Sequence, residues 1–351
     1  MKILFFINHL AGGGAERVAA ALLNHLCEQH DVTACFFCNR KPTFPISNKI
    51  LTQKIITKEN SKFVSAIKRT NQIRKLIKSN KPDLIISFLT YTNIYVLLAN
   101  LFQRKKIIVS EHNTLKRTRS KVVRIMRRII YPTANEITFV TKTDCQDFGL
   151  PEKSITIYNP ALFETFDDYN HRQKDIITIA SYERWYNKGL DLLIKAWRKI
   201  ESNNPDWNLE IYGDMQNITR PNIIDTQETE RIKINDWSNN INEILRAKSI
   251  FVLASRYEGC PCSLIEAMSQ GCACIVTDCD GGQKEIIDDG INGLIAETEN
   301  YDDIASKLQI LINDEQLRQR ISANAIDKIK QFDKNVFFVK WDDLIENVTN
   351  K

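Results

Sequence analysis

A strand, a polar turn and the start of a helix follow one another in residues 250–266, IFVLASRYEGCPCSLIE. The apolar run over residues 250–253 is typical of a strand that is buried on both faces. Pro261 suits the first position of a helix, where the N–H that proline lacks has no intrahelical partner. The stretch therefore predicts a buried parallel strand that leads directly into a helix, an order that suits phosphate binding.

Polar groups gather at the predicted start of this helix. The backbone N–H groups of Cys262, Ser263 and Leu264 are expected to point forward, toward a bound anion. Glu258 lies in the turn before the helix and Glu266 about one turn inside it, so two carboxylates would bracket the anion and accept hydrogen bonds from hydroxyl groups. From spacing alone, a helix with acidic residues near its first turn and no ligand explains the pattern equally well.

Short apolar runs alternate with helix-period segments along the whole chain, which predicts two parallel sheets with crossover helices. Ligands in such folds bind outside the carboxyl ends of the strands, so the cleft between the two units is the expected active site. The expected strands are residues 3–7, 32–37, 84–88, 107–110, 137–140, 176–180, 209–212, 231–234, 250–254 and 273–277.

Length and composition favour two domains for these 351 residues. A polar segment without clear period, residues 159–171, is the predicted linker. Residues 332–347 read as a final helix. Residues 1–170 hold 26 Lys and Arg against 13 Asp and Glu, so the remainder holds 22 against 30. The basic half predicts a polyanionic partner, either nucleic acid or an anionic membrane surface.

Cysteine content and the N-terminal residues both predict a cytoplasmic protein. The nine cysteines are odd in number, and the apolar run over residues 3–7 is too short for the core of a signal peptide. Residues 84–103 carry no charge and are long enough to span a bilayer, but the polar residues 90–93 interrupt them. We expect a buried strand followed by a helix there.

The first expected strand ends in a glycine-rich loop, residues 8–18, NHLAGGGAERV. Glycines allow close approach of the backbone to a ligand, although a tight turn alone also explains them. A dinucleotide fingerprint would need glycine where Arg17 stands, and no G-x-x-x-x-G-K-[ST] loop is present. His112 stands at the carboxyl end of another expected strand, where a ligand-binding role is favoured over a structural one.

Four cysteines, Cys260, Cys262, Cys272 and Cys274, raise the question of a zinc site. Their pairs are separated by single residues, whereas zinc sites have gaps of two to four, so buried small hydrophobic residues explain them better.

A strongly basic amphipathic helix is predicted within residues 116–131, KRTRSKVVRIMRRIIY. At 100° per residue the apolar residues 122, 125, 126, 129 and 130 share one face, and Lys121, Arg124, Arg127 and Arg128 share the opposite one. Either the apolar face docks on the core and the arginines are solvated, or the helix lies against anionic lipid. The charge of this half favours the membrane, and no aromatic-interleaved basic strand indicates nucleic acid.

The spacing of Glu258 and Glu266 matches the E-x7-E signature of the retaining glycosyltransferases of family 4, and the chain resembles this family from end to end. The surrounding Glu-Gly-x-Pro and Glu-Ala-Met, the Gly-Gly-x-Glu-Arg-Val of the first loop and the Lys188-Gly189 pair in the loop of residues 180–189 also match. The resemblance implies the GT-B fold, an α/β structure of two doubly wound Rossmann-like domains facing across a cleft. We expect an acceptor-side domain over 1–165, a nucleotide-sugar-binding domain over 172–331, and a C-terminal helix over 332–351 that crosses back to the first domain.

The resemblance also implies a role for individual residues. Glu258 and His112 would be catalytic, with Glu258 holding hydroxyls of the donor sugar and His112 contacting that sugar. Lys188 and Arg184 would clamp the departing diphosphate, although Arg184 lies closer to the lysine than the family arginine does. The remaining donor-binding residues would be Gly14, Gly259, Cys260, Ser263, Leu264, Glu266 and Glu285.

The expected activity is transfer of a hexose or N-acetylhexosamine, with retention, from a UDP-sugar or GDP-sugar to a polyprenyl-diphosphate-linked glycan in surface polysaccharide synthesis. Because cations of the protein would stabilise the diphosphate, no metal or other cofactor is expected. Arg124, Arg127 and Arg128 would hold the protein on the inner face of the membrane. Two alternatives stay open: a nucleotide-sugar epimerase or hydrolase of the same fold, and a non-catalytic membrane-binding scaffold.

Overall fold

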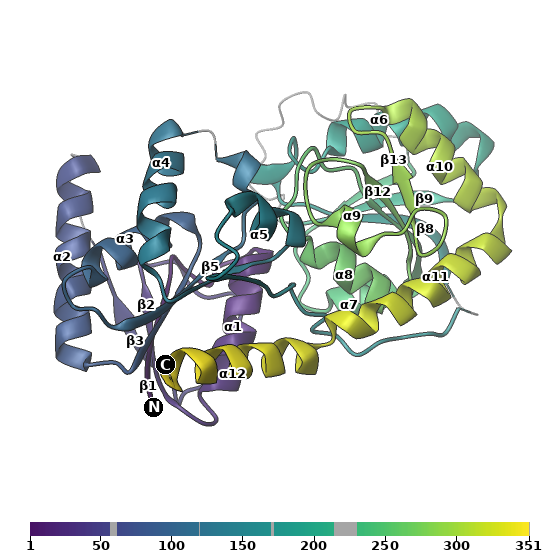
Figure 1. The fold of residues 1–351 in the computed structure, drawn as a ribbon. Coiled ribbons are helices and arrows are strands. Elements are labelled where there is room, and N and C mark those ends of the chain that lie inside the picture. Colours follow the sequence, from purple (N-terminus) through teal and green to yellow (C-terminus); the bar gives the residue numbers. More distant parts are fainter. Residues whose placement is uncertain (57–61, 119, 170–171, 214–229, 351) are drawn as a thin grey trace. The chain divides into compact units, whose positions relative to one another are not determined.

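The computed structural model describes residues 1–56, 62–118, 120–169, 172–213 and 230–350 (Figure 1). The chain forms two compact units: unit 1 is Met1–Asn159 with Asn335–Lys351, and unit 2 is Pro160–Lys334. Each unit is a parallel sheet with helices, so the predicted α/β class is confirmed. The boundary falls at the beginning of the predicted linker, of which residues 170–171 lie outside the described part.

In unit 1 the described strands form a seven-stranded sheet with the order β3-β2-β1-β4-β5-β6-β7, and every pairing is parallel. The strands are β1 Lys2–Ile7, β2 Asp31–Phe36, β3 Leu51–Lys54, β4 Leu84–Phe88, β5 Lys106–Glu111, β6 Glu136–Phe139 and β7 Ser154–Thr156. The helices are α1 Gly14–Leu26, α2 Lys62–Asn80, α3 Thr90–Asn100, η1 Leu115–Arg117, α4 Lys121–Ile130, η2 Tyr131–Thr133, α5 Lys142–Phe148 and α12 Lys334–Asn350.

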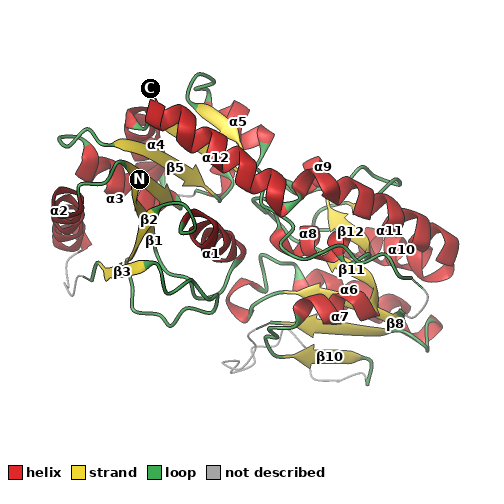
Figure 2. Cartoon of the chain, turned by 90° about the horizontal axis from the view of Figure 1, so that it is seen from below, coloured by secondary structure: helices red, strands yellow, loops and turns green. Residues whose placement is uncertain are grey.

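Helices cover both faces of the unit 1 sheet (Figures 1 and 2). On one face, buried residues of α2 and α3 pack on alternate residues of β1, β4 and β5. On the other face, the Trp341 ring of α12 stacks on Phe88 of β4, with 5.8 Å between the ring centroids. The C-terminal helix is thus a structural part of unit 1, although it follows unit 2 in the sequence.

In unit 2 the described strands form a six-stranded parallel sheet with the order β10-β9-β8-β11-β12-β13. The strands are β8 Gln173–Ile179, β9 Asn208–Tyr212, β10 Ile232–Asn235, β11 Lys248–Leu253, β12 Ala273–Thr277 and β13 Leu294–Ala296. The helices are η3 Tyr182–Arg184, α6 Leu190–Ile200, η4 Glu201–Asn203, α7 Ile241–Ala247, α8 Cys262–Ser269, α9 Gln283–Ile286, α10 Tyr301–Asn313, α11 Glu315–Ile329 and η5 Lys330–Phe332. Residues of α6 and α10 pack with β8, β9 and β11 in one apolar core.

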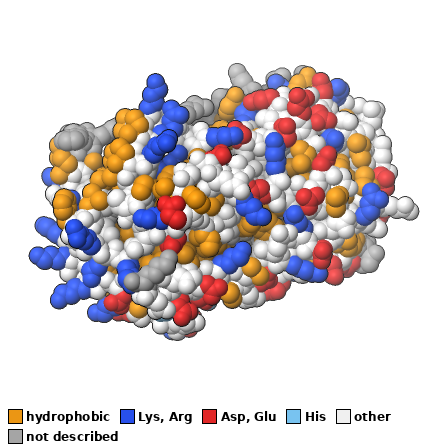
Figure 3. Space-filling model, in the orientation of Figure 1, with side chains coloured by type: hydrophobic (Ala, Val, Ile, Leu, Met, Phe, Trp, Pro, Cys, Tyr) orange, Lys and Arg blue, Asp and Glu red, His pale blue; other side chains and the backbone are white. Residues whose placement is uncertain are grey.

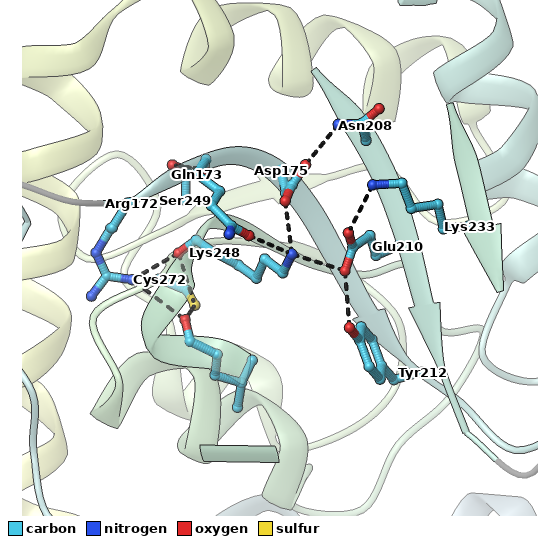
Figure 4. A network of polar contacts seen from close by, with 11 residues as sticks. Arg172, Gln173, Asp175, Asn208, Glu210, Tyr212, Lys233, Lys248, Ser249 and Cys272 are labelled. Carbon is cyan, nitrogen blue, oxygen red and sulfur yellow. Dashed lines mark hydrogen bonds and ion pairs between the residues drawn. The ribbon is translucent and has the colours of Figure 1, made fainter. Parts of the chain in front are cut away.

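A buried polar network explains why two strands of unit 2 begin earlier than the sequence predicted (Figure 4). Lys248, the first residue of β11, is 5 % exposed, and its Nζ lies 2.7 Å from Asp175 Oδ2 and 2.8 Å from Glu210 Oε2. Because each buried charge has a partner, β8 can begin with polar residues before its apolar run. These partners are distant in the sequence, so the apolar pattern alone did not reveal them.

The uncharged segment over residues 84–103 forms β4 and α3, as predicted. Among the described residues, no helix is both long and apolar enough to cross a membrane. The sequence did not predict the short strands β3, β7 and β13, which lie at or next to sheet edges.

Candidate functional site

The loop after β8 carries Lys188 and is held against the end of β11. Gly189 has a φ of +62°, and a Cβ there would lie 1.9 Å from the carbonyl oxygen of Ala254. A side chain is therefore excluded at this position, and glycine allows the loop to pack directly on the β11 backbone. The backbone N–H of Arg256 also donates to the Asn187 carbonyl at 2.8 Å. These contacts bring Lys188 to the turn that follows β11.

That turn carries Glu258 and is joined to the loop after β12. Glu258 N donates to Asp280 O at 3.0 Å, and Gly282 N donates to Gly259 O at 2.6 Å. Gly281 has a φ of +149°, and a Cβ there would lie 2.4 Å from the Glu258 carbonyl oxygen. The loop after β12 thus lies against both the N–H and the carbonyl oxygen of Glu258 and holds its backbone in place. Only glycine at position 281 allows so close an approach.

Lys188 and Glu258 form an ion pair, with 2.8 Å between Nζ and Oε1. The two side chains are 12 % and 10 % exposed. Ser255 Oγ donates to the same carboxylate oxygen at 2.6 Å. No described residue donates a hydrogen bond to Glu258 Oε2. The pair is therefore held in place by the protein, while one carboxylate oxygen can accept a hydrogen bond from a ligand.

The surroundings of Glu258 favour its charged form. Burial by itself would raise the pKa of Glu258, but Lys188, Ser255 and Arg184 outweigh burial and hold this pKa below its ordinary value. The predicted residue Arg184 is exposed at the end of η3, yet its charge is close enough to act on Glu258. The arrangement thus brings together an ionised carboxylate and two cations at the carboxyl edge of one sheet.

Arg256 ties these loops together and was not predicted from the sequence. Its guanidinium binds both carboxylate oxygens of Asp191 at 2.8 Å and one oxygen of Glu299 at 2.6 Å. It also lies over the Tyr186 ring, 3.8 Å from the centroid. Arg256 therefore connects the loop that carries Lys188 to the turn that carries Glu258. The only sequence feature that pointed to Arg256 is its position inside the 250–266 stretch. Its partner Asp191 is 65 residues away, so no local pattern connects the two residues.

The start of α8 differs from the prediction in one respect. Pro261 is the N-cap residue rather than the first helical residue, and Leu264 N donates to Pro261 O at 3.1 Å. The Leu264 N–H, which was expected to face a ligand, is therefore already bonded to a carbonyl oxygen in the first turn of the helix. Ser263 Oγ is buried and has no hydrogen-bond partner among the described residues, which leaves a polar group available to a ligand.

The other predicted residues of unit 2 lie on the same segments. Glu266 is 5 % exposed within α8, and Cys260 is 5 % exposed in the turn before it. Glu285 lies in α9, directly after the loop that binds the Glu258 backbone. Cys272 and Cys274 are fully buried in or next to β12, and all the cysteines have free thiols.

The first predicted loop of unit 1 ends where α1 begins. Gly14 is the first residue of the helix, and Gly13, with a φ of +100°, is its N-cap. His9 Nδ1 lies 4.0 Å from Glu16 Oε1, so the side chains of this loop face one another. The N-terminus of α1 is thus at the carboxyl end of β1.

His112 directly follows β5 at the same sheet edge of unit 1. Its ring stacks on Phe88, with 4.6 Å between the centroids, and its Nε2 lies 3.0 Å from Ser110 Oγ. Burial lowers the pKa of His112 to about 3, and a smaller opposing effect comes from Asn159 beside it. The imidazole is therefore neutral near pH 7 and can exchange hydrogen bonds without carrying charge.

The structure corrects the prediction for α4. Arg127 is buried, with its Nη1 3.9 Å from Glu111 Oε2 and its Nη2 3.3 Å from the Leu115 carbonyl oxygen. Arg127 therefore does not face a membrane, because a buried carboxylate and a carbonyl draw it inward. The predicted apolar face is also divided: Val122, Ile125 and Ile129 are 68 %, 57 % and 62 % exposed.

Two family models match the chain and together span most of it. The model of the Glycosyltransferase Family 4 matches residues 12–161, and the model described as Glycosyl transferases group 1 matches residues 163–328. The chain belongs to glycosyltransferase family 4. Lys188, Glu258, Ser263 and Glu266 thus stand in the glycosyltransferase group 1 segment, and Gly14 and His112 in the family 4 segment.

Relatives from bacterial glycan synthesis align with this family 4 glycosyltransferase over nearly their whole length. An α-1,4-N-acetyl-D-galactosaminyltransferase of Campylobacter jejuni, whose name specifies a GalNAc-GalNAc-diNAcBac-PP-undecaprenol acceptor, is 27 % identical over 100 % of this chain and 99 % of its own. The amylovoran biosynthesis glycosyltransferase AmsD of Erwinia amylovora is 26 % identical over 98 % of this chain and 99 % of its own.

Solved structures support the fold. HepE of Anabaena, solved in complex with UDP, has a TM-score of 0.78 and 17 % identity over 99 % of this chain and 100 % of its own. TarM has a TM-score of 0.79 and 13 % identity over 100 % of this chain and 99 % of its own. At these identities the likeness establishes the GT-B fold.

Proposed function

We propose that this glycosyltransferase moves a hexose or N-acetylhexosamine, with retention, from a nucleotide diphosphate sugar to a hydroxyl of a lipid-linked glycan. The observation that carries this proposal is the partly buried Lys188–Glu258 pair beside the start of α8, with 2.8 Å between Nζ and Oε1. It combines a cation suited to a phosphate with a carboxylate suited to sugar hydroxyls. Ser263 Oγ, buried and without a partner among the described residues, adds a third group for the same ligand.

In the proposed reaction, the bond between the anomeric carbon and the diphosphate oxygen breaks while a bond to the acceptor oxygen forms on the same face. The acceptor proton passes to the departing phosphate. Negative charge grows on that phosphate, and Lys188 and Arg184 would stabilise it. Glu258 Oε2 would accept from a hydroxyl of the donor sugar, and Glu266 would bind the ribose hydroxyls. Because the protein supplies both cations, the reaction would need no metal.

Unit 1 would add two further groups to the reaction. The Gly14 backbone N–H lies at the N-terminus of α1, which favours an anion such as the donor diphosphate. His112, neutral near pH 7, would exchange a hydrogen bond with a hydroxyl of the donor sugar. We assign no proton transfer to His112, because a pKa of about 3 makes it a poor base at physiological pH.

The relatives guide the choice of donor and acceptor. HepE was solved with UDP, and the Campylobacter relative is named as a transferase to an undecaprenol-diphosphate-linked glycan. We therefore favour a UDP-sugar over a GDP-sugar and a polyprenyl-diphosphate-linked acceptor.

The exposed side of α4 would hold the enzyme on the inner face of an anionic membrane. Val122, Ile125 and Ile129 recur every three or four residues and form an exposed apolar ridge, and Arg124 and Arg128 are exposed beside it. Figure 3 shows hydrophobic and basic side chains side by side over this part of unit 1. An apolar ridge flanked by arginines suits insertion at the boundary between headgroups and acyl chains.

A panel of UDP-sugars and GDP-sugars, incubated with and without polyprenyl-diphosphate-linked glycans, tests the proposal. We expect acceptor-dependent release of the nucleotide from one donor, an α-linked product, and an unchanged rate in EDTA. Release of free sugar, or a change in the sugar, without any acceptor would instead show a hydrolase or an epimerase. Failure to bind any nucleotide in the presence of intact membrane binding would show a non-catalytic scaffold.

A further inference from the structure

Glu111, the last residue of β5, is a fully buried carboxylate beside His112. Thr90 Oγ1, at the first residue of α3, donates to it at 2.7 and 2.8 Å. Tyr131 OH, directly after α4, donates at 2.9 Å. Asn113 N, in the loop after β5, donates at 3.2 Å. One side chain thus connects three segments at the carboxyl edge of the unit 1 sheet.

The hydrogen bond from Asn113 fixes the turn in which His112 lies. It joins the side chain of one residue to the backbone N–H two residues later, so it constrains the backbone of His112, the residue between them. Ser110, on the other side of Glu111, holds the ring of His112 through its Oγ and in turn accepts from Thr138 Oγ1 at 2.7 Å. The backbone and the ring of His112 therefore both depend on its neighbours in β5.

Burial of a carboxylate at position 111 costs free energy, which argues that the hydrogen bonds it accepts have a function. Burial raises the pKa of Glu111, although Arg127, Thr90, Tyr131 and Asn113 each act in the opposite direction. A buried apolar side chain would avoid this cost but would leave the Asn113 N–H and two hydroxyls without their acceptor.

We infer that Glu111 is a positioning residue that sets the place and orientation of His112 for the donor sugar. The inference rests on the proposed function, because the role of His112 in transfer is itself part of that proposal. Glu111 would act only through His112, since it is fully buried and cannot touch the substrate.

Glu111→Leu, Glu111→Gln, His112→Ala and the double variant Glu111→Leu/His112→Ala test this inference in the full chain. We expect Glu111→Leu to lower kcat roughly tenfold with the donor KM within about twofold, as for a misplaced group. Glu111→Gln should retain most of the rate, because its amide oxygen can still accept from Asn113 and its amide N–H groups can donate to the two hydroxyls. The double variant should be no slower than His112→Ala.

Independent, additive losses in the double variant would overturn the inference, as would a Glu111→Gln rate as low as that of Glu111→Leu. If Glu111→Leu does not fold, Tyr131→Phe replaces it, because it deletes a single hydroxyl donor. Its kcat loss, expected at about two- to fivefold, should disappear in the His112→Ala background. Asp175→Asn is the matched control, since Asp175 is a buried carboxylate of unit 2 that binds Lys248 and has no contact with the loop of His112 among the described residues. It should be additive with His112→Ala, and coupling of equal size there would also overturn the inference.

An NMR measurement that does not depend on enzyme activity separates this inference from the proposed function. In protein labelled with 15N-histidine, the ring of His112 should remain neutral from about pH 5 to 8. Glu111→Leu should shift the signals of this ring, because Glu111 no longer constrains the backbone of His112. Unchanged His112 signals in Glu111→Leu would refute the positioning role. If instead the signals shift but His112→Ala transfers sugar at the wild-type rate, the proposed role of His112 fails while the positioning stands.

Discussion

Glu258 and Glu111 occupy comparable places in the two units, each at or just after the carboxyl end of a buried parallel strand, but their surroundings differ. Glu258 is 10 % exposed, is paired with Lys188 at 2.8 Å, and has a lowered pKa. Glu111 is fully buried, lies 3.9 Å from Arg127, and has a raised pKa. The same edge of a Rossmann-like sheet therefore holds an accessible, ionised carboxylate in unit 2 and a sealed one in unit 1.

This difference teaches that the position of a carboxylate at a strand end does not define its role. Glu258 keeps one oxygen that no described residue occupies and has a close cation, so it can bind a ligand and still remain charged. Both oxygens of Glu111 accept hydrogen bonds from the protein itself. Under the proposed function, unit 2 would direct its charged groups toward a substrate, whereas unit 1 would use its buried carboxylate for support. Unit 1 exposes the basic residues Arg124 and Arg128 on α4.

The largest effect on activity should come from removing the carboxylate of Glu258. Glu258→Ala should lower kcat by about 100-fold or more, because it removes a hydrogen bond to the sugar near the reacting carbon. Glu266→Ala should mainly raise the Kd of the nucleotide, by roughly tenfold, because Glu266 would bind the ribose. Steady-state kinetics and calorimetric titration with the nucleotide separate the two effects. Asp302→Ala, at an exposed acid, is the control and should change neither. If both glutamate variants behave like this control, the assignment of the donor site is wrong.

A second effect concerns stability and its dependence on pH. In the wild type, the contribution of Glu258 is complete above its ordinary pKa of 4.5 and is lost as pH falls through the lowered pKa of the folded state. Lys188→Met leaves this carboxylate buried without its partner, so its pKa should rise and the free energy of unfolding near pH 7 should fall by about 3 kcal/mol.

Urea unfolding between pH 3 and 8 measures this change. Lys199→Met is the matched control, because the Lys199–Asp302 pair is 56 % exposed on both sides and should contribute less than about 1 kcal/mol. A Lys188→Met protein as stable at pH 7 as the Lys199→Met protein would show that the buried pair does not stabilise Glu258 in its charged form.

The sequence predicted the parts of the molecule that depend on local patterns. Apolar runs located the central strands of both sheets, whereas the short strands β3, β7 and β13 have too few buried residues to give such a run. Glu258 followed from its place in the turn before a helix and from the family resemblance, and Lys188 from that resemblance alone; the structure brings the two into contact. The tie between Arg256 and Asp191 was not predictable, because it depends on two loops meeting at the end of β11. The same reason explains Arg127: helical periodicity placed it among the exposed arginines, but a buried carboxylate on another strand draws it inward.

The smallest effect on the chemistry should come from the exposed side of α4. Arg124→Ser/Arg128→Ser should weaken binding to anionic liposomes about 30-fold at low salt, since each of the two arginines near such a surface contributes about 1 kcal/mol, and should leave donor hydrolysis unchanged. Val122→Ser/Ile125→Ser should weaken binding at high salt as well, because apolar insertion is not screened. Arg127→Ser should instead lower the free energy of unfolding, because it leaves Glu111 without a cation. Liposome sedimentation and urea unfolding of the three proteins distinguish these outcomes. If Arg124→Ser/Arg128→Ser sediments like the wild type at low salt, α4 is not a membrane-binding surface, and the basic charge of unit 1 must serve another partner.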